Sequence, residues 1–258
     1  MKHAFTVARK DFLSYLNSWI GVFVLGFFFL MAGLFFYLLV MTYVRISMNA
    51  SQSLYPSVEG LGLTRFVYSS YFLNLSVVLL FFVPLLTMRS FAEEKRHQTL
   101  ELLFTYPLSD FEIVWGKYLG MVWFFELMLL PTAVTIPLVI WAGGSIDWGP
   151  VVVGYLGFWL LGTAYLSLGL FVSSISENQV VSAMLTFATL IFLWALDWVA
   201  GVMTGPWAAF VSALAPIRHY REFPLGILDL SHIVYFCFFT LFFLFLSLRA
   251  VETRNWKG

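Results

Sequence analysis

The chain has 258 residues, of which 61% are hydrophobic and only 11% are charged, and its formal net charge is zero. A soluble domain carries about 25% charged residues, so this composition excludes a water-soluble globular protein, which needs polar groups to cover its surface. The zero net charge gives no indication of a nucleic-acid partner, and the single cysteine, Cys237, excludes an intrachain disulfide framework.

Residues 1–18 predict an amphipathic helix. Phe5, Ala8, Phe12 and Leu16 recur at helical spacing, while the basic residues of this segment occupy other positions around the helix. Such a helix lies in the cytoplasmic interface of a membrane, with its basic residues near lipid headgroups. The alternative interpretation is a basic flank that only orients the first span.

Six apolar stretches are long enough to cross a membrane, since a spanning helix needs roughly 20 mostly apolar residues. Polar segments with turn residues separate them, without a long hydrophilic insertion. The sequence therefore predicts an all-α polytopic membrane protein, a single domain of six transmembrane helices. The predicted spans are about 19–43, 70–88, 118–141, 151–172, 180–202 and 230–249.

The distribution of basic residues predicts the orientation. Ten of the 14 lysine and arginine residues fall on the side of the N-terminus when the six spans are laid out. Cytoplasmic loops carry the excess of lysine and arginine in membrane proteins. Both termini are therefore expected in the cytoplasm, with residues 44–69 and 203–229 outside.

The segment 89–117 between the second and third spans holds the one large charge cluster of the sequence. Its charged residues lie at 93–101, and Leu100, Leu103 and Phe104 add an apolar stripe at helical spacing. A short helix with one charged and one apolar face suits docking to a cytoplasmic partner. The alternative is a solvated loop whose charges only fix the topology.

A second short helix is expected later in the same segment. Pro107 ends the first helix, and Ser109 or Asp110 can cap the next one. That second helix carries Phe111, Val114 and Trp115 before the third span begins.

Two ionisable residues fall inside predicted spans, where charge is costly and indicates function by default. Glu126 lies near the middle of the third span and Asp197 near the outer end of the fifth. Each either lines a translocation path or pairs with a neighbouring helix. Pro131 and Pro137 are expected to kink the third span because proline removes a helical hydrogen bond.

The fourth span and the last external segment carry further signals. Gly162, Gly169 and Ser173 lie on nearly one face, which suits close helix packing within one subunit or between two.

Within the external segment, residues 208–214 are apolar but too short to span. They predict a re-entrant piece that gates the outer mouth or contacts an external partner, or else a capping loop.

The order of several motifs resembles the ABC-2 type permease family, and within it the permease subunit of the gliding-motility-type ABC transport system. The likeness extends over essentially the whole chain, although each motif alone is only moderately specific. The motifs are Ala8-Arg9-Lys10-Asp11-Phe12, Arg89-x-x-x-Glu93-Glu94-Lys95-Arg96-x-x-Thr99-x-Glu101-x-Leu103, Tyr106-Pro107-Leu108-Ser109, Gly116-Lys117, Phe223-Pro224-Leu225-Gly226 and Leu248-Arg249-Ala250-Val251-Glu252.

The resemblance implies a six-span permease subunit in the inner (cytoplasmic) membrane that pairs with a second permease copy as a homo- or heterodimer. Coupling helices would dock on a separate P-loop ATPase subunit, whose ATP-driven closure drives export, and an auxiliary membrane-anchored subunit can accompany the complex. The implied main coupling residues are Glu93, Glu94, Lys95, Arg96, Thr99, Glu101 and Leu102, and the implied second coupling turn is Ser176, Glu177 and Asn178.

ATP hydrolysis is not expected in this chain itself. A P-loop needs Gly-x-x-x-x-Gly-Lys-Ser/Thr, whose backbone amides hold phosphate groups. At Gly116-Lys117 the first glycine is replaced by Phe111, and Tyr118 follows the lysine. We therefore expect no cofactor bound by this chain, with ATP and Mg²⁺ used by the partner ATPase.

Other classes of function are disfavoured by what the motifs lack. The four histidines, His3, His97, His219 and His232, show no zinc-enzyme spacing, and no Gly-x-Ser-x-Gly occurs, so neither a catalytic nor a metal site is expected. Isolated intramembrane carboxylates disfavour an ion-coupled carrier. The alternative that stays open is a non-transporting anchor, which transmits ATP-driven motion to an extracytoplasmic machine.

Overall fold

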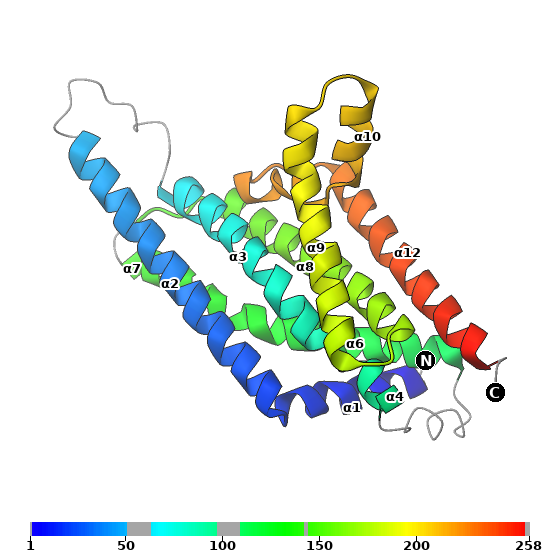
Figure 1. Ribbon diagram of the computed structural model, residues 1–258. Coiled ribbons are helices and arrows are strands. Elements are labelled where there is room, and N and C mark those ends of the chain that lie inside the picture. The colour runs from blue at the N-terminus through cyan, green and yellow to red at the C-terminus, as the bar shows by residue number, and fades with distance from the viewer. Residues whose placement is uncertain (1, 51–62, 97–108, 142–143, 256–258) are drawn as a thin grey trace.

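The computed structural model describes residues 2–50, 63–96, 109–141 and 144–255, and every regular element in these ranges is helical (Figure 1). Six helical segments there are long and apolar enough to cross a membrane. They comprise α2 (Trp19–Ala50), α3 (Leu63–Thr87), α6 (Asp110–Leu129) continued by η1 (Leu130–Val134) and α7 (Thr135–Trp141), α8 (Trp148–Ile175), α9 (Gln179–Val202) and α12 (Leu230–Asn255).

Shorter helices occupy both ends of this bundle. The first and last described residues lie at the same end as α4, whereas α10 folds back beside the far end of α9 (Figure 1). The shorter helices are α1 (Lys2–Leu16), α4 (Ala92–Arg96), α10 (Pro206–Leu214), α11 (Pro216–Tyr220) and η2 (Phe223–Leu225).

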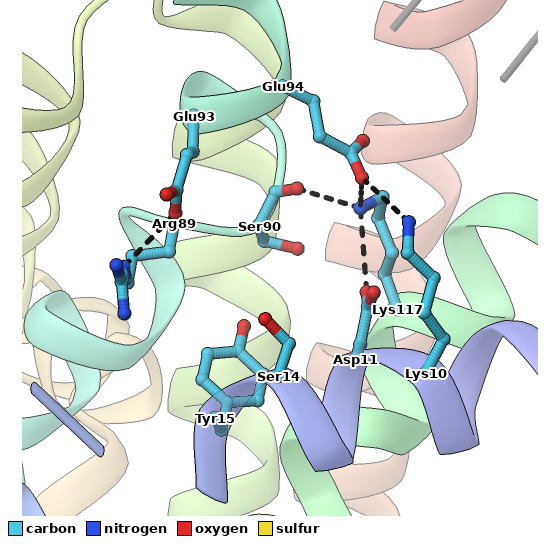
Figure 2. Close-up of a pocket in the computed structure, with 9 residues that line it drawn as sticks. All are labelled: Lys10, Asp11, Ser14, Tyr15, Arg89, Ser90, Glu93, Glu94 and Lys117. Atoms are coloured by element: carbon cyan, nitrogen blue, oxygen red, sulfur yellow. Dashed lines mark hydrogen bonds and ion pairs between the residues drawn. The ribbon is translucent and has the colours of Figure 1, made fainter. Parts of the chain in front are cut away.

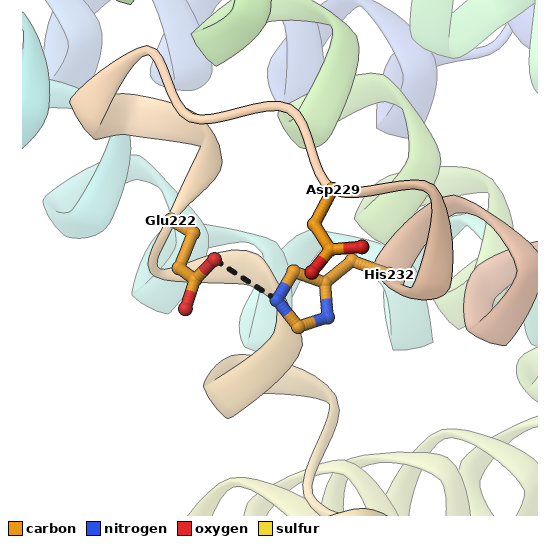
Figure 3. Close-up of side chains that lie close together, drawn as sticks. All are labelled: Glu222, Asp229 and His232. Carbon is orange, nitrogen blue, oxygen red and sulfur yellow. Dashed lines mark ion pairs between the residues drawn. The ribbon is translucent and has the colours of Figure 1, made fainter.

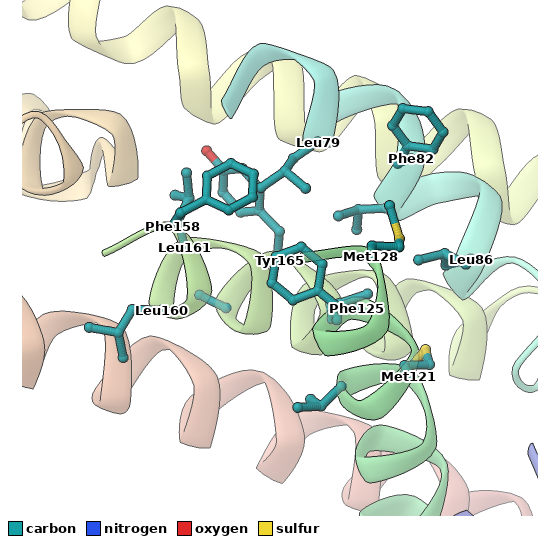
Figure 4. Close-up of a cluster of buried hydrophobic side chains, with 14 of the residues drawn as sticks. Leu79, Phe82, Leu86, Met121, Phe125, Met128, Phe158, Leu160, Leu161 and Tyr165 are labelled. Atoms are coloured by element: carbon teal, nitrogen blue, oxygen red, sulfur yellow. The ribbon is translucent and has the colours of Figure 1, made fainter. Parts of the chain in front are cut away.

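Helix α8 is the centre of the packing. It contacts α3, α6, α9 and α12, and 72% of its most apolar window is buried, against 17% for α2, α9 and α12. Side chains from α3, α6 and α8 interdigitate in the core, among them Phe125, Phe158 and Tyr165 (Figure 4).

The small residues of α8 make this packing possible. A Cβ atom at Gly162 would collide with the ring of Phe125, and one at Gly169 would collide with Thr87. These positions therefore bring α8 against α6 and α3 of the same chain. The sequence left open whether this small-residue face packs within one subunit or between two. Packing within one subunit accounts for both glycines.

The third span is broken where proline interrupts it. Helix α6 ends at Leu129, a 3-10 turn contains Pro131, and α7 starts at Thr135. Pro131 has no N–H to donate to the preceding turn, so the hydrogen-bond ladder stops there. The break thus falls at the first of the two prolines, while Pro137 lies within α7.

The start of this span differs from the sequence prediction. Residues 110–117 do not form a separate short helix but are the first turns of α6. Ser109 caps the helix as expected, because its hydroxyl accepts the Glu112 N–H at 3.3 Å while the Glu112 carboxylate accepts the Ser109 N–H at 3.4 Å. No proline follows this cap until Pro131, so the helix continues into the span.

The first span lies at the edge of the bundle. Helix α2 inclines away from the bundle (Figure 1) and exposes large apolar side chains such as Phe23 and Leu30, which suits contact with lipid. A cavity of about 570 Å³ lies between α2, α3 and the broken third span, lined by Phe36, Tyr71 and Leu138 among others.

Candidate functional site

The short helix α4 begins against the end of α8. The backbone N–H groups of Phe91 and Ala92 donate to the buried hydroxyl of Ser173, at 3.1 and 3.2 Å. The first N–H groups of a helix have no partner within it and need such an acceptor. A side chain of α8 therefore holds the start of α4.

The same two helices are joined a second time in the opposite direction. The Lys95 ammonium of α4 donates to the carbonyl oxygens of Ser174 and, at 3.2 Å, of Ser176. These carbonyls belong to the last turn of α8, where unpaired acceptors and the helix dipole favour a cation. The two segments that the family resemblance implies as coupling elements are thus joined to each other.

Lys117 is the most deeply buried cation in the described part of the chain, with a side chain only 2% exposed. Its Nζ lies 2.8 Å from the Glu94 carboxylate of α4 and 3.4 Å from the Asp11 carboxylate of α1, and it donates to the Ser90 carbonyl at 2.8 Å. A buried ammonium is stable only when paired and hydrogen-bonded. Lys117 therefore ties α1, α4 and α6 together.

More exposed charges surround this buried centre. Lys10 approaches Glu94 at 3.8 Å, and Arg89 forms an ion pair with Glu93 at 3.0 Å. The Arg89 guanidinium also donates to the Ser18 hydroxyl. We call Lys10, Asp11, Arg89, Glu93, Glu94 and Lys117 the Lys117 cluster; it lines a pocket of about 120 Å³ (Figure 2).

Two glycines allow α1 to approach α6 closely enough for these contacts. A Cβ atom at Gly116 would lie 2.7 Å from the Ala4 carbonyl oxygen, and one at Gly120 would lie 2.9 Å from the Ala8 carbonyl oxygen. The spacing Gly-x-x-x-Gly puts both on one helix face, where small residues let backbones meet. Helix α1 therefore lies on α6 in a fixed register.

Tyr15 links the end of α1 to the second span. Its hydroxyl donates to the Leu86 carbonyl of α3 at 3.3 Å, and its side chain is buried. Burial, and then the nearby Asp11 carboxylate, raises the pKa of the Tyr15 phenol well above its usual value. The phenol consequently stays protonated and keeps this bond at any ordinary pH.

These contacts add a protein partner to the helix predicted for residues 1–18, whose place at the membrane interface stays a prediction. A helix is present, but its small residues and Asp11 face α6, and only part of its surface is exposed. The partner surface on α6 lies more than a hundred residues away in sequence. Amphipathicity alone does not distinguish a lipid surface from the surface of another helix.

The predicted main coupling residues are only partly described. Glu93, Glu94 and Lys95 lie in α4 and take part in the ion pairs and hydrogen bonds above. Four predicted residues fall outside the side chains that the structure describes, namely Arg96, Thr99, Glu101 and Leu102.

The predicted second coupling turn divides into structural and exposed positions. Ser176 is buried, and its hydroxyl donates to the Val172 carbonyl at 2.8 Å. Asn178 caps α9 by accepting the Val180 N–H at 2.9 Å. Glu177 and Asn178 are both exposed, and because the Asn178 side chain caps α9, Glu177 is the better candidate for contact with a partner.

The two intramembrane carboxylates have different surroundings. Glu126 is exposed on the outer face of α6 and accepts a hydrogen bond from the Trp159 indole at 3.2 Å. Asp197 is buried at the end of α9, where it pairs with Arg221 at 2.6 Å. Neither residue joins the Lys117 cluster.

Sequence reasoning missed the centre of the site. The sequence places Lys117 only in a short motif and an incomplete P-loop, and Asp11 only in the motif at residues 8–12. The available signal was Gly116-x-x-x-Gly120, with a lysine directly after the first glycine. That pattern predicts a close helix partner, although it does not name one.

Comparison with known proteins agrees with the architecture. A family model described as an ABC-2 family transporter protein matches residues 5–256. No curated protein matches the chain. The matched range includes most of α1 and all of α4 and α8, together with all six candidate spans.

Proposed function

The chain belongs to the ABC-2 transporter family, a multi-pass membrane component of transport systems, and from that premise we propose that it couples ATP hydrolysis in a separate subunit to export. The α4 end of the bundle is the docking surface for a P-loop ATPase in this proposal, with α4 and the turn 176–178 as the coupling elements. This end, with both termini, then faces the cytoplasm.

One observation carries the proposal: the two candidate coupling elements are joined to each other and to the spans by buried polar contacts. Ser173 holds the start of α4, Lys95 holds the end of α8, and Lys117 holds α4 to α6 and α1. A displacement of α4 by a partner is therefore transmitted to α1, α6 and α8 together.

The packing of α8 supports a route for this transmission. Helix α8 is the central packing element, so a force on its end reaches the helices that surround it. The cavity beside α2 leaves room for the helices that line it to move. ATP-driven closure of the partner would thus move the core and open or close the space beside α2.

Docking is tested with charge reversal at the two ends of α8. Glu177, just beyond its last residue, is exposed near α4, and Asp147, just before its first residue, is exposed at the opposite end. Purification under mild detergent is expected to recover a P-loop ATPase with the unaltered protein and with Asp147→Lys. Glu177→Lys is expected to lose it.

Recovery of a lone polypeptide in several detergents would contradict ATPase docking altogether. Equal recovery of the ATPase with both variants would remove the turn 176–178 from the docking surface. The same complex in proteoliposomes separates export from the alternative of an anchor that only transmits motion, since the anchor hydrolyses ATP without moving a solute.

The assembly around this subunit belongs to the same proposal. A second permease copy, identical or related, completes the translocation path, and an auxiliary membrane-anchored subunit of the gliding-motility type accompanies it in the inner membrane. The second copy is supported by the family to which the chain belongs.

A further inference from the structure

The end of the molecule opposite α4 carries a second group of ionisable side chains. Glu222 precedes η2, Asp229 precedes α12, and His232 lies in the first turn of α12 (Figure 3). One ligand atom from each lies within 4.8 Å of the other two. We call these three residues the His232 cluster.

A chain of hydrogen bonds fixes how His232 faces the carboxylates. The Ala213 carbonyl lies 3.2 Å from Nε2 of His219 and can only accept, so Nε2 of His219 carries the proton. With His219 neutral, its Nδ1 is an acceptor and takes the proton of His232 Nδ1 at 3.0 Å. Nε2 of His232 is then left with a lone pair.

The lone pair on His232 Nε2 faces the negatively charged carboxylate of Glu222. Nε2 of His232 is buried and makes no hydrogen bond of acceptable geometry, although the Glu222 Oε2 atom lies only 3.2 Å away. Two acceptors at this distance repel each other unless a cation lies between them. The arrangement therefore calls for either a proton on the imidazole or a metal ion.

The backbone holds the acidic residues in place around this point. Gly226 has φ of 81°, and a Cβ atom there would lie 2.9 Å from the Pro150 nitrogen, so the turn between Glu222 and Asp229 depends on glycine. The Ile227 N–H donates to the Glu222 carbonyl at 3.2 Å. The turn thus brings Asp229 back toward Glu222.

We propose that Glu222, Asp229 and His232 bind a divalent transition-metal cation of the zinc class, with His219 as the positioning residue that orients the His232 imidazole. One nitrogen and two carboxylate oxygens suit zinc, and a water completes a tetrahedral set. A metal-bound histidine usually donates its other N–H to a fixed acceptor, which is the role His219 has here.

The three ligand atoms would need to move only slightly closer together to bind a zinc ion. Ligand atoms about 2.1 Å from a tetrahedral ion are about 3.4 Å apart, against the present limit of 4.8 Å. Asp229 is exposed, and one of its oxygens caps α12 through the Ser231 N–H at 2.8 Å, which leaves the other for a ligand bond. A bound ion would clamp the η2 turn to the start of the last span.

The test is zinc binding by the full chain in detergent after treatment with a chelator. We expect about one zinc ion per chain after incubation with Zn²⁺ and desalting in the presence of excess Mg²⁺, together with a raised Tm. Glu222→Gln and His232→Gln should lose the zinc. His219→Ala should bind it about 10- to 100-fold more weakly.

Two matched variants control for nonspecific uptake. His3→Ala removes an exposed histidine at the other end, and Asp147→Asn removes an exposed carboxylate near the same end; both should retain the zinc. Absence of zinc from the unaltered chain, or unchanged uptake in Glu222→Gln and His232→Gln, overturns the proposal and assigns a proton to His232. This readout does not depend on ATPase docking.

Discussion

The two polar clusters at opposite ends of the bundle are built differently. The Lys117 cluster has a fully buried ammonium and joins helices that are far apart in sequence, with Asp11 and Lys117 separated by 106 residues. The His232 cluster joins residues within one short stretch, and its carboxylates are open to solvent. The first arrangement suits a mechanical connection between helices, and the second suits a site that binds an ion from the solvent.

The largest loss of stability is expected when the central residue of the Lys117 cluster is replaced. Lys117→Met leaves the Asp11 and Glu94 carboxylates without their ammonium, which costs about 3–5 kcal/mol when a buried pair loses one partner. Lys10→Met is the matched control, because Lys10 also approaches Glu94 but its side chain is 63% exposed. Its loss should cost less than about 1 kcal/mol.

Thermal unfolding in detergent compares the two lysine variants directly. Equal and small losses of stability would mean that burial of Lys117 does not distinguish it from Lys10. Restored stability in a triple variant that also neutralises Asp11 and Glu94 would assign the loss to the uncompensated carboxylates.

The next effect concerns the register of α1 on α6. Gly116→Ala puts a Cβ atom 2.7 Å from the Ala4 carbonyl oxygen and from the Val7 Cβ atom, and such overpacking costs about 1–3 kcal/mol. Gly26→Ala in α2 meets nothing within 4 Å and should be neutral or slightly stabilising. Amide hydrogen exchange of α1 measures the displacement, and unchanged exchange in Gly116→Ala would contradict the close approach.

A smaller effect is expected where α8 caps α4. Ser173→Ala removes the acceptor for the Phe91 and Ala92 N–H groups, which costs about 1 kcal/mol. Ser167→Ala is the control on the same helix, because its buried hydroxyl donates only to the Ala164 carbonyl one turn earlier. In the proposed complex with an ATPase, Ser173→Ala should also weaken the stimulation of ATP hydrolysis, whereas Ser167→Ala should not.

The smallest loss of stability is expected at the end of the bundle opposite α4. Asp197→Asn removes an ion pair whose arginine, Arg221, is 54% exposed, so we expect a loss of about 1 kcal/mol or less that shrinks as salt is raised. Tm measured at low and high ionic strength checks this. A loss as large as that of Lys117→Met would erase the contrast between the two ends.

The sequence predicted what depends on local pattern. Six spans follow from apolar length, the break at Pro131 from a missing N–H, and the cap from Ser109 as one of two polar residues that follow Pro107. The charge run at Glu93 to Lys95 indicated a site because the charges are adjacent in the chain.

The remaining features depend on which distant residues meet. Lys117 finds Asp11 only after α1 has packed on α6, and His219 finds His232 only because the turn around Gly226 reverses the chain. Spacing cannot reveal partners that folding brings together. For the same reason, the sequence indicated no metal ligands among histidines that lie 13 residues apart.

The contact between α1 and α6 also sets an order of biogenesis. Helix α1 leaves the ribosome before α6, because its docking face on α6 is synthesised more than a hundred residues later. Until the third span is inserted, α1 has no protein surface to cover Ala4, Val7 and Ala8. Because α1 is amphipathic, it can bind the lipid surface with its apolar face during this interval. It then moves onto α6 once the third span, with Lys117, has been inserted.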